Sequence, residues 1–265
     1  MKKFSTGAKV NLSLAVTGRR GGLHTLDMRV CTLSLFDSAE IVRGEGERFV
    51  FLAEPEGFVR AKFLPLLDEI YLKLQARFGG EPCFLLEKHI PSGKGMGGSS
   101  ALAASMALAW AEECGGRVDA ELALSLGSDV PYMLTGGEAR VTGRGEDVTP
   151  LPYVAREALV LLPNGGVDTA EAYALYDRMK EEGSLPERRG EYFNDLYAPA
   201  ARLCPDVGRA VRALKESGAE NAVMTGSGSA VCAFFEDKEE LARVAERVGG
   251  EFDSLILRTL PARGE

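Results

Sequence analysis

Residues 91–104 read PSGKGMGGSSALAA, and the rest of the chain is organised around this stretch. An apolar, strand-like segment, 83–90, precedes it, and an alanine-rich run that favours a helix follows it. Strand, glycine loop and helix in this order build an anion site. Glycine N–H groups approach an oxyanion closely, and the helix points its positive dipole end at the same place. Ser99 and Ser100 are expected to cap the helix and to offer hydroxyls to a phosphate or Mg²⁺, and Lys94 adds a cation to the loop.

Two common phosphate-binding motifs do not fit this loop. A Walker A loop carries Lys-Ser/Thr directly after its last glycine, whereas here Lys94 lies upstream and serines follow Gly98. The Rossmann fingerprint does not match either. The alternative is a flexible loop without a ligand, and the apolar segment before the loop and the immediate helix after it argue against that alternative.

Composition narrows the class of protein. The chain has 265 residues, enough for one large domain or two small ones. A net charge of −8 disfavours a general nucleic-acid binder. Five widely spaced cysteines without a CxxC pair, and only two histidines, do not indicate a zinc site. Since neither a signal-peptide core nor an apolar run of about 18 residues is present, we expect a cytoplasmic protein that does not span a membrane.

Strand-like and helix-like segments mix without the regular alternation of a parallel doubly wound sheet, so the predicted fold class is α+β. We expect strands at 8–16, 28–41 (broken by the acidic stretch 37–40), 49–52, 83–90, 138–142, 159–162, 222–224, 230–235 and 254–257. We expect helices within 58–78 and at 101–110, 120–126, 170–180, 205–217 and 238–248, with another helical segment beginning at 192.

A few polar residues stand out, each with a plainer alternative. Lys9 and Asn11 share one face of the first strand and could project into a site together, or could simply face solvent. Asp129 follows a helix in a small-residue turn before Pro131, where aspartate is common for local hydrogen bonding. His24 alone is more often a structural hydrogen-bonding residue than a site residue.

Taken together, three signatures resemble the GHMP kinase superfamily. They are the strand with Lys9 and Asn11, the P-x-G-x-G-M-G-G-S-S loop at 91–100 and the T-G-S-G-S loop at 225–229. Within the superfamily the chain is most similar to kinases that act on a cytidine-diphosphate-linked methylerythritol in the non-mevalonate isoprenoid pathway. The segments that carry this likeness span nearly the whole chain: 8–12, 17–20 leading to His24, 127–131, 169–173, 194–196 and 224–228.

The resemblance implies two α+β lobes, an N-terminal domain at 1–150 with the phosphate loop and a C-terminal domain at 151–265, with the active site in the cleft between them. It implies ATP and Mg²⁺ as cofactors. The metal would be held through the ATP phosphates, with Ser99 or Ser100 as a further candidate ligand. The implied ATP-binding residues are Pro91, Ser92, Gly93, Lys94, Gly95, Met96, Gly97, Gly98, Ser99 and Ser100.

The resemblance also implies roles around the phosphate that is transferred. Asp129 would take or orient the proton of the attacking hydroxyl, and Lys9 beside it would neutralise developing charge. The implied substrate-binding residues are Asn11, His24 at the cytosine end, Tyr192 stacked on the base, and Thr225 and Gly226 closing the site.

The expected partner is therefore a small molecule with a cytidine diphosphate end, bound by a monomer or homodimer without nucleic acid or membrane. Leu23 departs from the family pattern, which carries an aromatic residue there. One alternative is another GHMP kinase that acts on a sugar phosphate or a mevalonate-like alcohol. A second is a non-catalytic nucleotide-binding sensor of the same fold, against which the presence of both Lys9 and Asp129 argues.

Overall fold

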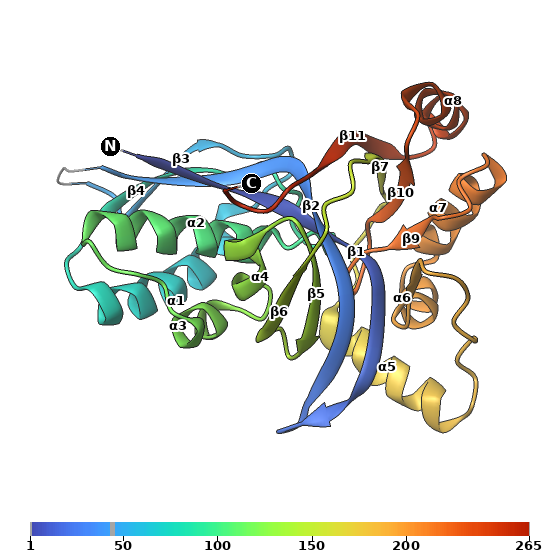
Figure 1. Ribbon diagram of the computed structural model, residues 1–265, viewed down its shortest axis with the longest axis horizontal. Coiled ribbons are helices and arrows are strands. Elements are labelled where there is room, and N and C mark those ends of the chain that lie inside the picture. Colours follow the sequence, from blue (N-terminus) through green and yellow to red (C-terminus); the bar gives the residue numbers. More distant parts are fainter. Residues whose placement is uncertain (1, 43–45, 265) are drawn as a thin grey trace.

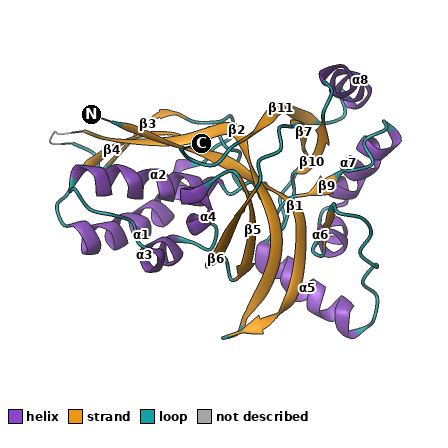
Figure 2. Ribbon diagram, viewed as in Figure 1, coloured by secondary structure: helices purple, strands orange, loops and turns teal. Residues whose placement is uncertain are grey.

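The computed structural model describes residues 2–42 and 46–264, and within them eleven strands join into one sheet flanked by helices (Figures 1 and 2). The strands are β1 (Lys3–Arg20), β2 (Leu23–Val42), β3 (Phe49–Ala53), β4 (Cys83–Glu87), β5 (Glu138–Gly143), β6 (Asp147–Leu151), β7 (Glu157–Leu162), β8 (Phe193–Asn194), β9 (Val223–Met224), β10 (Val231–Phe235) and β11 (Asp253–Leu260). The helices are α1 (Arg60–Phe78), α2 (Gly98–Glu113), α3 (Ala120–Leu126), α4 (Val130–Thr135), α5 (Thr169–Glu181), α6 (Tyr197–Leu203), α7 (Pro205–Glu216) and α8 (Lys238–Val248). The fold is therefore mixed α+β, as the sequence predicts.

Strands β1 and β2 form a long antiparallel pair that runs through the centre of the molecule (Figure 1). It extends well beyond the predicted strands, and the break predicted at 37–40 is wrong, because β2 continues unbroken to Val42. Asp37 is fully buried there and pairs with the ammonium of Lys88 at 2.7 Å. An acidic residue inside a strand is tolerated because a partner neutralises it.

Helix α2 packs directly on β1 and β2 and is buried along most of its length. The helix is apolar almost all round, as expected of a central helix. Its many alanines allow it to approach the sheet closely. The helix begins at Gly98 with Gly97 at the N-cap position, and no side chain caps it. The expectation that Ser99 and Ser100 cap this helix is therefore wrong, since both lie in its first turn.

The two halves of the chain meet through β11. This strand pairs with β2 of the N-terminal half and with β7 of the C-terminal half, so one sheet path, β3-β4-β2-β11-β7-β10-β9, runs through both. Helices α1 to α4 gather beside the N-terminal part of the sheet, α6 to α8 lie with the C-terminal strands, and α5 lies beside the hairpin end of β1 and β2 (Figure 1).

Three short elements differ from the predictions. Helix α4 and strand β6 occupy segments for which neither was expected, and the segment predicted to be helical from 192 contains β8 instead, with α6 beginning at Tyr197. Strand β8 is fixed by its parallel pairing with β1, which is a long-range contact and leaves no periodic pattern in a two-residue strand. Within the described residues we find no helix with the length and apolar character needed to span a bilayer.

Candidate active site

The predicted Lys9 and Asp129 pair forms in the structure. Lys9 Nζ lies 3.6 Å from Asp129 Oδ2, and the lysine side chain is 6% exposed whereas the aspartate side chain is 30% exposed. Asp129 occupies the N-cap position of α4, yet its carboxylate makes no capping hydrogen bond. The buried Lys9 ammonium therefore faces an Asp129 carboxylate that makes no hydrogen bond to the first turn of α4.

Asn11 ties this pair to the late glycine loop. Its Oδ1 accepts hydrogen bonds from Lys9 Nζ at 3.0 Å and from the Gly226 N–H at 2.8 Å, and the Asn11 N–H donates to Thr225 Oγ1 at 3.1 Å. The Nδ2 of Asn11 is buried and has no partner among the described residues. A buried donor without an acceptor is costly, so this atom fits a ligand oxygen at the site.

The central glycine loop packs against both of the other signatures. Gly95 has φ +72°, and a Cβ there would lie 2.3 Å from the Thr225 carbonyl oxygen. Gly97 has φ +74°, and a Cβ there would lie 2.8 Å from Lys9 Cγ. The buried Met96 contributes its carbonyl, which accepts from the Lys9 N–H at 3.0 Å. Only glycine fits at these close approaches, so the three signatures converge on one place at the start of α2.

We expected Lys94 to add its charge to the glycine loop, but its ammonium is bound by other segments. Its Nζ donates to the Pro163 carbonyl at 2.5 Å, to the Gly165 carbonyl at 2.8 Å and to Ser229 Oγ at 3.3 Å. Burial lowers the pKa of this lysine. Lys94 therefore joins the glycine loop to two turns of the C-terminal half, and Pro91, Ser92 and Gly93 complete the outer part of the loop.

The two serines of the loop differ in position. Ser99 is exposed, whereas Ser100 is half-buried with its Oγ against Gly127, in the turn that leads to Asp129. Among the described residues no group of three or more His, Cys, Asp or Glu side chains is arranged to hold a metal ion. The donors present fit Mg²⁺ that takes most of its ligands from phosphates and water, with a hydroxyl or a single carboxylate from the protein.

His24 lies in an aromatic cluster with α5. Its ring stacks on Tyr173 with centroids 4.5 Å apart and an interplanar angle of 19°, and Tyr176 meets it edge-on at 6.3 Å. Burial and, next, the charge of nearby Asp129 raise the pKa of Tyr173 to about 12, so Tyr173 stays neutral beside the site. His24 Nε2 also lies 2.9 Å from Asp177 Oδ1. Tyr173 and Asp177 were missed as candidates, although their i, i+4 spacing on a predicted helix places them on one face.

Tyr192 lies apart from this cluster. Its ring stacks on Phe234 at 5.8 Å and lines a cavity of about 350 Å³ whose walls include Arg188 and Val223. Neither His24 nor the Lys9 pair lines that cavity. Leu23, at the turn of the β1–β2 hairpin, is 57% exposed.

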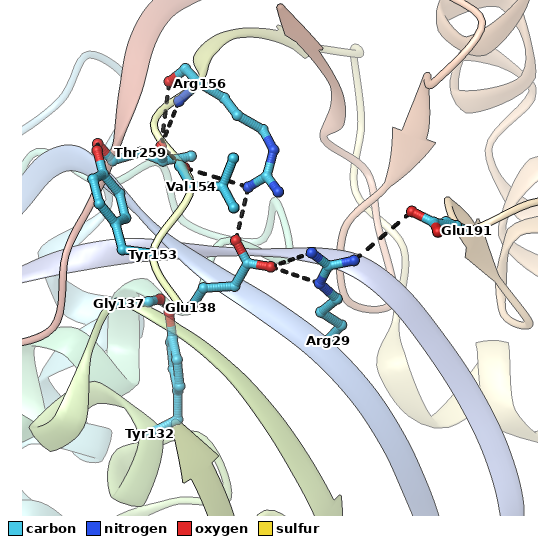
Figure 3. Close-up of polar contacts among 9 residues, drawn as sticks. All are labelled: Arg29, Tyr132, Gly137, Glu138, Tyr153, Val154, Arg156, Glu191 and Thr259. Atoms are coloured by element: carbon cyan, nitrogen blue, oxygen red, sulfur yellow. Dashed lines mark hydrogen bonds and ion pairs between the residues drawn. The ribbon is translucent and has the colours of Figure 1, made fainter. Parts of the chain in front are cut away.

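A second ionic cluster joins the two halves of the chain (Figure 3). The Glu138 carboxylate is 2% exposed and accepts from Arg29 Nε at 2.6 Å and from Arg156 Nη1 at 2.8 Å. Cys31 pairs with Glu138 whereas Thr32 pairs with Lys9, so this cluster and the candidate active site project from opposite faces of β2. The cluster therefore fixes the junction between the halves without taking part in the site.

Comparisons with known proteins agree with this geometry. The family described as GHMP kinases N terminal domain matches residues 65–137, and the one described as GHMP kinases C terminal matches residues 182–254. The chain is 35% identical to the 4-diphosphocytidyl-2-C-methyl-D-erythritol kinase of Polaromonas sp. strain JS666, covering 89% of this chain and 84% of that protein. It is also 35% identical to the enzyme of that name from Cereibacter sphaeroides strain ATCC 17029, covering 92% and 93%.

Solved structures show the same relationship. A crystal structure of 4-(cytidine 5'-diphospho)-2C-methyl-D-erythritol kinase superposes with a TM-score of 0.75 at 29% identity, over 97% of this chain and 99% of that one. The L. major mevalonate kinase in complex with R-mevalonate superposes with a TM-score of 0.75 at 14% identity, over 98% and 96%, which shows the fold alone. From the converging loops, the family matches and these relatives, the chain belongs to the GHMP kinase family of ATP-dependent phosphotransferases.

Proposed function

We propose that this kinase transfers the γ-phosphate of ATP to a hydroxyl of 4-diphosphocytidyl-2-C-methyl-D-erythritol, in the biosynthesis of isoprenoid precursors. The observation that carries the phosphoryl-transfer part is the buried Lys9 beside the uncapped Asp129, with the unpartnered Asn11 Nδ2 next to them at the start of α2. The substrate is supported by the relatives of that name, which align over most of the chain.

The residues suit phosphoryl transfer, which depends on positioning and on charge neutralisation. The backbone of 91–100 and the first turn of α2 bind the phosphates, with Ser100 near them. Asp129 takes or orients the proton of the attacking hydroxyl while the new O–P bond forms and the bond to the leaving diphosphate breaks. Lys9 offsets the charge that develops there. Ser99 or Ser100 would offer a hydroxyl ligand to Mg²⁺ bound with ATP, and the metal would supply positive charge that neutralises the phosphates.

We assign the cytidine end of the substrate to the aromatic cluster of His24, Tyr173 and Tyr176. His24 and Lys9 lie on the same face of the β1–β2 pair, because His24 is an even number of residues from Thr32, which pairs with Lys9. Tyr173 stacks on His24, and the charge of Asp129 contributes to the raised pKa of the Tyr173 phenol. A cytidine diphosphate end is proposed to run along this face, with Asn11, Thr225 and Gly226 at the reacting end. Tyr192 as a base-stacking residue stays a prediction, since its ring contacts Phe234.

The proposal extends to the organisation of the protein. We keep the division into an N-terminal domain, 1–150, and a C-terminal domain, 151–265, acting as a cytoplasmic monomer or homodimer. Strand β6 ends at Leu151, so this boundary falls one residue before the end of β6.

ATP consumption by the purified protein with Mg²⁺ tests the function. The acceptors are the cytidyl compound, mevalonate, phosphomevalonate, homoserine and several sugar phosphates. Turnover of the cytidyl compound alone is expected. Turnover of another acceptor alone would keep the phosphoryl-transfer roles and overturn the substrate, and ATP binding without any turnover would favour a nucleotide sensor.

A further inference from the structure

The Asp177 carboxylate determines which nitrogen of His24 carries the proton. Asp177 Oδ1 lies 2.9 Å from His24 Nε2, and Oδ2 is paired with the Arg19 guanidinium. An ionised carboxylate only accepts hydrogen bonds, so Nε2 must be the donor. Partial burial opposes ionisation, but the hydrogen bonds from His24 and Arg19 hold the pKa of Asp177 below its usual range.

The ring itself is held in place. The His24 side chain is 12% exposed, with Tyr173 against one face and Tyr176 at its edge. Within residues 2–42 and 46–264, Nδ1 of His24 has no hydrogen-bond partner. By contrast, the other histidine, His89, is 47% exposed and lies 3.8 Å from Glu87. A neutral His24 protonated on Nε2 therefore offers a hydrogen-bond acceptor at Nδ1.

We propose that Asp177 is a positioning residue which, through His24, selects a cytosine over a uracil base. The inference rests on the proposed function, because it assigns the base end of that substrate to His24. Cytosine carries a donor, its 4-amino group, where uracil carries a carbonyl acceptor. The Nδ1 lone pair of His24 accepts a hydrogen bond from the 4-amino group of cytosine and repels the carbonyl oxygen of uracil. One hydrogen bond gained against one left unmade gives a discrimination of about 10- to 100-fold.

The isosteric variant Asp177→Asn is expected to reverse the proton position. Arg19 only donates, so it holds the amide oxygen of the asparagine and turns the amide NH₂ towards His24. Nε2 must then accept, and the proton moves to Nδ1, which becomes a donor. Asp177→Glu retains a carboxylate and is expected to retain the original proton position.

Nitrogen NMR of the two histidine rings, at a pH where both are neutral, tests the proton position without any substrate. A His89→Gln variant assigns the signals. We expect Nε2–H at His24 in the parent protein and in Asp177→Glu, and Nδ1–H in Asp177→Asn. Nδ1–H in the parent, or an unchanged proton position in Asp177→Asn, would overturn the inference.

Turnover of the cytidyl substrate and of its deaminated uridyl counterpart tests the selection. In Asp177→Asn the ratio of the two kcat/KM values is expected to fall by at least about tenfold, with KM for ATP unchanged. Asp27→Asn is the matched control, because Asp27 lies on β2 like His24 and also pairs with an arginine, Arg140 of β5, without touching His24. An unchanged ratio in Asp177→Asn would overturn the role of Asp177 alone. No turnover of the cytidyl compound by the parent enzyme would overturn the proposed function and the base selection together.

Discussion

Two lysine–aspartate pairs lie on either side of the start of α2, and they are built differently. Lys9 and Asp129 are 3.6 Å apart, and the carboxylate is partly open and makes no capping bond. Lys88 and Asp37 are 2.7 Å apart and fully buried, and Asp37 Oδ1 also accepts from the N–H of the next two residues, His89 at 2.7 Å and Ile90 at 2.9 Å. The Asp129 carboxylate is partly exposed and can bind a ligand, whereas the Asp37 carboxylate is fully buried and is held by Lys88 and two backbone N–H groups of the protein.

The difference shows that residue types do not determine the use of an ion pair. Burial raises the pKa of Asp37 and lowers the pKa of Lys88, in both cases against the partner's charge, so the closed pair exists at an electrostatic cost. It supports the chain just before the glycine loop. Consecutive glycines separate the two lysines: Gly97 packs on Lys9, and a Cβ on Gly98 would lie 2.8 Å from Lys88 Nζ.

The largest effect is expected at the open pair. Asp129→Asn keeps the shape and removes the carboxylate, so turnover should fall by about 10²–10⁴-fold, the usual contribution of a positioned acid or base. ATP binding should stay close to that of the parent, and the free energy of unfolding should fall less than at the closed pair, because Lys9 loses its counter-charge but keeps its hydrogen bond to Asn11. Steady-state turnover and an ATP titration check this, with the exposed Asp68→Asn as control. Near-normal turnover would remove Asp129 from the mechanism.

At the closed pair, stability should change instead. Lys88→Met leaves Asp37 buried without its partner and should lower the free energy of unfolding by about 3–5 kcal/mol. Denaturant unfolding followed by the fluorescence of Trp110, the single tryptophan, measures it. The double variant Lys88→Met with Asp37→Asn keeps an acceptor for the His89 and Ile90 N–H groups and should cost less than the sum of the two single changes. Additive costs would show that the two side chains are not coupled.

A pair of glycine variants tests the contact between the loop and the open pair. Gly93→Ala and Gly97→Ala both place a side chain at positive φ, at about 1–2 kcal/mol each. A Cβ at Gly93 meets nothing within 4 Å, whereas one at Gly97 would lie 2.3 Å from Met133 Cε and 2.8 Å from Lys9 Cγ. Gly97→Ala should therefore lower turnover by about tenfold more than Gly93→Ala, roughly 1.4 kcal/mol. Equal losses of turnover in the two variants would show that backbone strain at positive φ accounts for the whole effect.

The smallest effect is expected at Lys94. Lys94→Met removes the bonds to Pro163, Gly165 and Ser229 and loosens the loop, so KM for ATP should rise by about tenfold with kcat nearly unchanged. Lys62→Met, on the exposed side of α1, is the control. A fall in kcat with KM unchanged would instead place the Lys94 charge at the transferred phosphate.

Regular elements with a clear period were predicted well: α3 has the predicted bounds, and the α+β class is confirmed. Short elements were missed, because β6 and β8 are held by pairing with β5 and β1 rather than by a pattern of their own. Lys88 and Asp37 were not singled out, since nothing local indicates that two distant charges meet in the core.

The sequence by itself identified the motifs that make up the candidate site. The glycines at 91–98, Lys9 with Asn11, and the loop at 225–229 are local motifs whose backbone and donor requirements can be read from residue type and spacing. Only the tertiary structure decided which partners the charged side chains have. Lys94 binds the carbonyl of Pro163, and His24 binds Asp177. The Lys9–Asp129 pair is partly exposed, whereas the Lys88–Asp37 pair is fully buried. The physical reason is that the energy of a charge depends on burial and on partners, and both are set by segments that only the fold brings together.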